Sequence, residues 1–376
     1  MLKDKDYREL ENAISRIYSD IETSLVRRIC RWLRMNPDGT LDPEDWRLRK
    51  LSGLGVMQVD IRNLLVEESA HNESKVIEAV SKAVDANGKS DIKLYQAIME
   101  YTKQDKGVVL KIAASDMQKA RIDAVIKNAR KALNMTNTLA LEASQQSFLD
   151  AVNSAYLRVM EGAYTLDDAC WYASKALARK GLTIATYNGP TATNISMDAA
   201  VRRNVVTSVA QATAEMSKGM AQDLGFDLVQ TSAHVGARPQ HQLWQGKVFS
   251  LSGKSDKYPA LSAPQEAGGT GYGTAEGLCG CNCRHHFFPY AEGFSPADYG
   301  IDISPAENEE IYNATQKQRQ YERQIRSWKR TARVAEDQGK TIDANNATAR
   351  VRGYQKVLRE LCDRYDLPRE YAREKV

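Results

Sequence analysis

The sequence predicts a mainly helical α+β protein in three consecutive regions. Apolar side chains recur every three to four residues through much of residues 1–182, which is the spacing of amphipathic helices. Over residues 183–303 short strand-like runs alternate with loops that hold most of the glycine and proline. Residues 304–376 return to helical spacing. We therefore expect a helical N-terminal region, a small mixed central domain and a helical C-terminal tail.

The N-terminal region opens with an amphipathic segment. Its apolar residues follow one another at steps of three and four: Ile14, Ile17, Tyr18, Ile21, Leu25, Ile29 and Trp32. Asp42 followed by Pro43 then has the pattern of a helix cap with proline in the first turn. The pattern predicts one long helix and the start of a second.

Residues typical of turns and helix caps divide the rest of this region. Asn87-Gly88 is expected to separate two helices. The later helical pattern, from about Asp116 to Met160, should break near 134–138. Thr165 with Asp168 has the spacing of a capping box, and the helix that it opens should end at Gly181. The region therefore reads as a set of helices joined by short connections.

The helical spacing of apolar residues ends at Leu182. Residues 183–187 read as a strand, and Ser196 as the cap of a helix that runs to about Asp223. Residues 226–232 again resemble a strand, and a loop-rich stretch follows. This part of the chain should form a small domain with few aliphatic residues and long loops.

Composition and charge narrow the class of protein. Hydrophobic residues make up 42% of the chain and charged residues 27%, which is typical of a folded domain and not of a disordered one. No apolar run is long enough to span a bilayer, and the N-terminal segment lacks the apolar stretch of a signal peptide. We expect no membrane contact and a reduced, cytosolic site of synthesis.

The basic character of the chain lies at one end. The net charge is only +4, but residues 311–376 hold sixteen Lys and Arg against nine Asp and Glu. Five arginines repeat there at helical spacing: Arg319, Arg323, Arg326, Arg330 and Arg333. An apolar stripe lies about 200° away on the helical wheel. The arginine face is either solvated or a contact for DNA or an acidic protein surface.

Cysteine and histidine cluster in the central region. Zinc takes about four thiolate or imidazole ligands, usually as two close pairs. His234 and His241 can supply one pair and Cys279 and Cys283 the other, with His285 as a substitute. A structural zinc ion would stabilise a small domain with long loops. The alternative is that these are packed cysteines and hydrogen-bonded histidines.

The same residues allow an enzymatic interpretation. Zinc could activate water, or Cys283 could act as a nucleophile with His241 or His285 as its base. The motifs of zinc proteases and zinc deaminases are absent, and no carboxylate stands in the cluster as an evident general base. We therefore expect that the chain is not an enzyme.

Several rare residues in the central region stand in a fixed order. The segments are 200–205 (AVRRNV), His234 with 236–239 (GARP) and His241, 244–246 (WQG), and 282–285 (NCRH). In this order they resemble the signature of the phage minor capsid protein 2 family, which is distantly similar to head morphogenesis proteins of the Mu F type. The residues that carry the resemblance are Arg202, Arg203, Arg238, Trp244, Gly246, Asn282 and Arg284. Cys281 stands where the family usually has tryptophan, so a shared role for Cys281 is not expected.

The resemblance implies a structural protein of a tailed phage, made in the host cytoplasm and present in several copies in the head of the virion. It also implies the portal protein or the major capsid protein as partner, at the portal vertex or the capsid interior, with packaged DNA as a further contact. The alternative is a metal-dependent hydrolase that is packaged in the virion and ejected with the genome.

Overall fold

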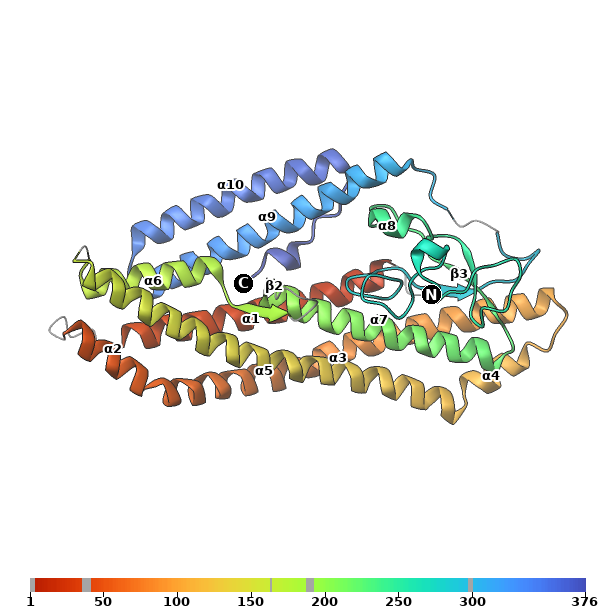
Figure 1. Ribbon diagram of the computed structural model, residues 1–376, viewed down its shortest axis with the longest axis horizontal. Coiled ribbons are helices and arrows are strands. Elements are labelled where there is room, and N and C mark those ends of the chain that lie inside the picture. Colours follow the sequence, from red (N-terminus) through yellow and green to blue (C-terminus); the bar gives the residue numbers. More distant parts are fainter. Residues whose placement is uncertain (1–3, 36–41, 163, 187–192, 297–299) are drawn as a thin grey trace. The chain divides into compact units, whose positions relative to one another are not determined.

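Helices make up most of the chain in the computed structural model, which describes residues 4–35, 42–162, 164–186, 193–296 and 300–376. The fold class predicted from the sequence is confirmed: the protein is mainly helical, with small antiparallel sheets (Figure 1). The helices are α1 (Asp4–Arg34), α2 (Pro43–Ser52), α3 (Leu54–Tyr101), α4 (Gly107–Ala113), α5 (Asp116–Met160), α6 (Leu166–Lys180), α7 (Met197–Asp223), α8 (Pro239–Gln242), α9 (Pro305–Asp337) and α10 (Thr341–Tyr365), with short 3-10 helices η1 (Gln265–Ala267) and η2 (Tyr371–Glu374). The strands are β1 (Thr183–Thr186), β2 (Thr193–Ser196), β3 (Leu228–Thr231), β4 (Val248–Ser250) and β5 (Phe287–Pro289). Within the described ranges, no helix combines the length and the apolar character that a bilayer crossing requires.

The chain forms two compact units, each assembled from three separate stretches. Unit 1 comprises Met1–Glu11, Lys75–Leu133 and Arg203–Gln316, and unit 2 comprises Asn12–Ser74, Asn134–Arg202 and Lys317–Val376. This division by contact differs from the three consecutive regions expected from the sequence. Compactness does not decide which segments fold independently, so those regions stay a prediction.

Unit 1 contains the three-stranded sheet in the order β4-β3-β5, and both pairings are antiparallel. Val229 of β3 faces Phe249 of β4 and Pro289 of β5 in the register. A separate apolar cluster in the same unit joins α3, α4 and α7 through Tyr95, Val109 and Met220. The small sheet and this cluster supply the apolar packing on which long loops rest.

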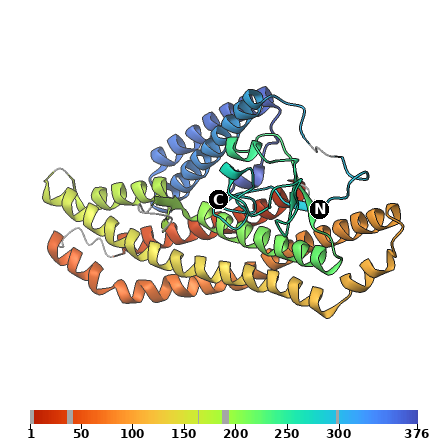
Figure 2. The ribbon, with the colours of Figure 1, turned by 45° about the vertical axis from the view of Figure 1, so that its right-hand side comes forward.

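Unit 2 is organised around α1. The predicted stripe from Ile14 to Ile29 is buried, as expected, but polar residues between its members are buried as well, among them Ser19 and Glu22. Helices α9 and α10 lie side by side (Figure 2) and pack through Ile325, Val351, Leu358 and Cys362. Helix α1 therefore buries polar residues in this unit in addition to its predicted apolar stripe.

The predicted helix ends are partly confirmed. Asp42 caps α2 ahead of Pro43, and Thr165 caps α6, which ends at Gly181. The breaks expected at Asn87-Gly88 and at 134–138 are wrong, because α3 and α5 run through them without interruption. At the first of these the Asn87 side chain is buried inside unit 1 and donates hydrogen bonds to Asp91 and Ser217. These bonds hold Asn87 within the helix, although asparagine followed by glycine often forms a turn.

Candidate metal centre

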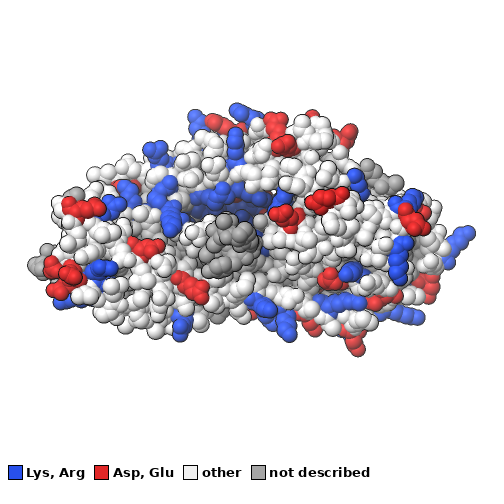
Figure 3. Space-filling model, in the orientation of Figure 1, with Lys and Arg blue, Asp and Glu red and all other residues white. Residues whose placement is uncertain are grey.

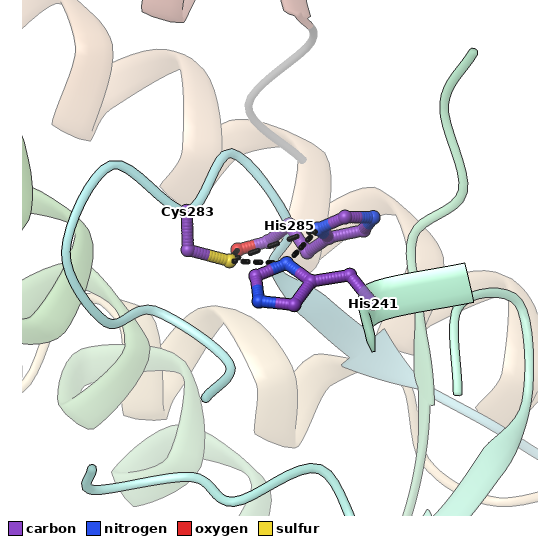
Figure 4. Close-up of side chains that lie close together, drawn as sticks. All are labelled: His241, Cys283 and His285. Carbon is purple, nitrogen blue, oxygen red and sulfur yellow. Dashed lines mark hydrogen bonds between the residues drawn. The ribbon is translucent and has the colours of Figure 1, made fainter. Parts of the chain in front are cut away.

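Three of the five predicted metal ligands meet in unit 1. His241 lies on α8, a short helix that Pro239 opens, while Cys283 and His285 lie on the loop that leads into β5. Pairing of β5 with β3, with Thr231 opposite Phe287, fixes where this loop enters the sheet. The thiol of Cys283 points toward the two imidazole rings (Figure 4). All three side chains are buried.

The three donor atoms form a nearly equilateral triangle. The Nδ1 atoms of His241 and His285 are 3.4 Å apart, and Sγ of Cys283 is 3.8 Å and 3.7 Å from them. A tetrahedral zinc ion, with bonds of about 2.0–2.1 Å to nitrogen and about 2.3 Å to sulfur, holds two nitrogens about 3.3 Å apart and a sulfur about 3.6 Å from each. The triangle therefore has the dimensions of one face of a zinc tetrahedron.

The second nitrogen of each ring is held by an oxygen acceptor. His241 Nε2 lies 2.8 Å from the carbonyl oxygen of Glu276, and His285 Nε2 lies 3.1 Å from Oε1 of Gln245. The same Oε1 accepts the backbone N–H of His234, which fixes the orientation of the amide. Both Nε2 atoms therefore carry the ring hydrogen, and both Nδ1 atoms of the neutral rings present lone pairs.

This tautomer leaves the triangle short of hydrogens. Two bare nitrogens and one sulfur face one another, and the thiol supplies only one hydrogen. A cation at the centre would satisfy all three lone pairs at once. Metal-bound histidine usually donates its other ring N–H to an oxygen acceptor, which fixes the orientation of the ring.

Burial sets the protonation states of these groups. It lowers the pKa of His241 to about 4 and holds the pKa of His285 well below its ordinary value. Burial also raises the pKa of the Cys283 thiol to about 11. The centre is thus neutral at pH 7 without a metal, and a thiolate nucleophile activated by a protonated imidazole is disfavoured. A bound metal would displace the thiol hydrogen.

The loop that carries Cys283 folds tightly on itself. A side chain at Gly277 would overlap the carbonyl oxygen of Gly271, so only glycine fits there. Asn282 adopts a positive φ of 55°, a conformation that asparagine tolerates better than most residues. Arg238 donates a hydrogen bond of 2.6 Å to the carbonyl oxygen of Cys281 and ties this loop to the start of α8.

The other two predicted ligands lie beside the triangle. The ring of His234 stacks on that of His285 at a centroid distance of 4.1 Å, and its Nδ1 lies 3.3 Å from the carbonyl oxygen of Val235. Cys279 is buried, and its thiol lies 3.6 Å from the carbonyl oxygen of His285. Neither belongs to the group of three donors within 4.8 Å of one another.

The residues of the central signature largely build this centre. Trp244 is buried, and its ring lies 4.7 Å from both His241 and His285. Gly246 has a positive φ of 75° in the turn before β4. Arg284 forms an ion pair of 2.9 Å with Glu11 of the same unit. Sequence reasoning missed Gln245 as a ligand-orienting residue, although it lies inside the signature segment. No sequence pattern predicts that the backbone carbonyl of Glu276 accepts a hydrogen bond from His241.

The remaining signature residues, Arg202 and Arg203, lie on α7. Both are half-buried. Arg202 lies 3.4 Å from the hydroxyl of Ser15 within unit 2.

The arginine face predicted on α9 needs a correction. Arg326 and Arg330 are each only 5% exposed. Arg326 pairs with Asp198 at 2.7 Å, and Arg330 pairs with Glu22 at 3.0 Å. Both arginines therefore lie inside unit 2, paired with carboxylates of α7 and α1. Because they are buried, they are not available to phosphates.

The other members of that face differ among themselves. Arg323 and Arg333 are exposed, and Arg319 is half-buried. In Figure 3, Lys and Arg gather in a band over α9, while the rest of the visible face mixes both signs. Sequence reasoning missed a second set of exposed basic residues, all on α10: Arg350, Arg352, Lys356, Arg359 and Arg364.

Comparison with known proteins gives these features a biological setting. The chain is 26% identical over 340 residues to a structural protein of Lactococcus phage LL-H, with 88% of each chain covered. It is also 38% identical over 109 residues to a structural protein of Lactococcus phage mv4, covering 28% of this chain and 86% of the relative. No solved structure matches. Both relatives are described as structural proteins of phages.

The family can be named more closely. The sequence profile of phage minor capsid protein 2 matches residues 2–363, nearly the whole chain, and the chain belongs to that family. It is therefore a component of the phage virion capsid, and the resemblance recognised in the central signature is confirmed.

Proposed function

We propose that this minor capsid protein is a structural part of the phage head that acts at the portal vertex or on the inner capsid wall, in several copies, by binding the portal protein or the major capsid protein. The observation that carries the proposal is the family match over residues 2–363 together with relatives described as structural proteins.

An apolar surface in unit 2 supports a protein partner. Val56, Val59 and Val66 of α3 are 63%, 54% and 62% exposed, and their spacing places them on one side of the helix. Leu48 of α2 is 59% exposed in the same unit. Exposed aliphatic side chains on one side of a helix favour a protein contact over a fully solvated helix face.

Particle composition tests the assembly role. We expect mass spectrometry to find the chain in purified virions or proheads, crosslinked to portal or major capsid protein. A variant with Val56→Gln, Val59→Gln and Val66→Gln should fold normally and enter particles poorly, whereas Glu67→Gln on the same helix is the matched control. Absence of the parent chain from both kinds of particle would refute the structural role. Normal entry of the triple variant would exclude this face.

A contact with packaged DNA is supported by α10. Of its exposed basic side chains, Arg352, Lys356 and Arg359 follow at steps of four and three and share one side of the helix. Replacing these three with glutamine should reduce the salt dependence of duplex binding by about 2.7 in log–log slope, since each phosphate contact contributes about 0.9. The same substitution at Arg326, which is buried, should not change the slope if the chain remains folded. Binding that does not depend on salt would refute the contact.

The metal centre has a structural role in this proposal. Thiolate and imidazole donors at tetrahedral spacing suit zinc, and the donors lie where α8, the glycine-rich loop and β5 converge. A zinc ion there would join loops that have little regular secondary structure of their own. The purified chain should contain about one zinc ion, and a chelator should lower its melting temperature.

A virion-packaged metal-dependent hydrolase is the second candidate. One observation favours it: the described donors number three, and catalytic zinc sites usually have three protein ligands and one open position. Against it, no described carboxylate belongs to the group to serve as general base. Chelator-sensitive hydrolysis of peptide or ester substrates by the folded chain, lost in a His241→Ala variant that still folds, would reverse the ranking.

A further inference from the structure

We propose that Cys279 is the fourth ligand of the metal centre, so that the protein holds the ion in a closed set of two thiolates and two imidazoles. This inference rests on the metal proposed above and goes further, because it assigns a residue to the position that a catalytic site would leave to water. Cys279 would turn from its present contact toward the ion.

The two cysteines converge on one point. Sγ of Cys279 lies 3.6 Å and Sγ of Cys283 lies 3.9 Å from the same carbonyl oxygen, that of His285. Both cysteines are almost fully buried, whereas Cys281 between them is half-exposed. Both thiols therefore contact the backbone of one candidate ligand, His285.

The backbone of Cys279 is unusual. Its φ is +58°, in the left-handed region that side-chain-bearing residues other than asparagine and aspartate rarely adopt. Gly280, the next residue, is pressed against the backbone at Ala275, where a side chain would collide with carbonyl oxygens. The loop thus accepts an unfavourable conformation that brings the Cys279 thiol against the backbone of His285, and strain of this kind is concentrated at functional sites.

Charge balance favours two thiolates over one. A divalent ion with one thiolate and two neutral imidazoles would leave a net charge of +1 among buried side chains, and no described carboxylate belongs to the group to compensate it. Burial of an uncompensated charge is strongly unfavourable. A second thiolate makes the centre neutral. Cys279 can supply it, because its thiol is buried and contacts the backbone of His285.

Cobalt substitution of the full chain tests the assignment. The chain is produced with Co²⁺ in place of zinc, and the thiolate-to-cobalt charge-transfer absorption is measured per bound ion. We expect Cys279→Ser to halve this absorption and Cys281→Ser, the matched control, to leave it unchanged.

Each result decides a different point. A parent chain whose bound ion shows one thiolate would overturn the assignment of Cys279 while leaving the metal centre, with an open position, in place. A parent chain that binds no metal would overturn both. If Cys279→Ser fails to fold, the number of sulfur neighbours found by X-ray absorption on the parent zinc protein decides the same question: two support the proposal and one refutes it.

Discussion

Replacing Arg330 with methionine removes one partner of a buried ion pair and keeps most of the apolar volume of the side chain. Arg330 is bonded through Nη1 to Oε2 of Glu22 at 3.0 Å and through Nε to the carbonyl oxygen of Ala178 at 3.1 Å. The side chains of Arg330 and Glu22 are only 6% and 1% exposed. Methionine cannot replace either hydrogen bond, so the variant leaves a buried carboxylate without its cation.

Breaking such a pair typically costs about 3–5 kcal/mol of unfolding free energy. For a cooperative unit of 150–250 residues this corresponds to a melting temperature lower by roughly 6–20 °C. Arg323→Met, on the exposed side of the same helix, should change stability by less than about 0.5 kcal/mol. The double variant Arg330→Met, Glu22→Gln should recover much of the loss, because glutamine can still accept the backbone N–H of Leu182, now 2.9 Å from Glu22.

The unfolding free energy lost in the Arg330→Met variant should depend on pH. Burial raises the pKa of Glu22 even in the parent chain, against the opposing charge of Arg330. Without Arg330 the pKa rises further, so the variant retains stability below the unfolded value of about 4.3 and loses it as pH rises through the folded value. Urea unfolding at pH 4.5 and pH 7 should therefore show the larger deficit at pH 7. A deficit at pH 7 no larger than that of Arg323→Met would refute the buried pair and restore a continuous arginine face.

Three further predictions concern other parts of the chain. Burial alone would raise the pKa of Asp198, but its cationic neighbours hold it below the ordinary value. Asp198 therefore contributes stability above about pH 4 that is lost as pH falls, and Asp198→Asn should flatten the acid limb of the urea midpoint. Gly277→Ala should cost about 1–3 kcal/mol by overpacking and reduce bound zinc, whereas Gly353→Ala, with open space around it, should be neutral or stabilising by calorimetry. His241→Ala should remove the bound metal in elemental analysis, with a lower melting temperature that added zinc does not restore.

The sequence predicted helices well where side-chain spacing or caps decide the structure. The stripe of α1 and the caps of α2 and α6 depend on local rules, and those predictions are confirmed. Asn87-Gly88 did not break α3, because Asn87 is held by Asp91 and Ser217 from α7, about 130 residues later. Such a partner cannot be read from local sequence.

The arginines of α9 show the same limit at a larger scale. Their spacing predicts one face of a helix, but it does not reveal that Asp198 and Glu22 lie opposite two of them. In the candidate metal centre, residue type placed His241, Cys283 and His285 among five candidate ligands, while their grouping depended on the register of β5 against β3. The candidate residues could be predicted from the sequence, but which of them lie together could not.

The pairing of Glu22 with Arg330 has a consequence for synthesis on the ribosome. The two residues are 308 positions apart, so at about 5–20 residues per second Glu22 leaves the ribosome roughly 15–60 s before its partner is made. Over that interval α1 has neither its arginine nor the helix that covers it, although its aliphatic side chains are already present. Nascent chains of unit 2 are therefore exposed to chaperones and to aggregation for most of the time that they take to be translated.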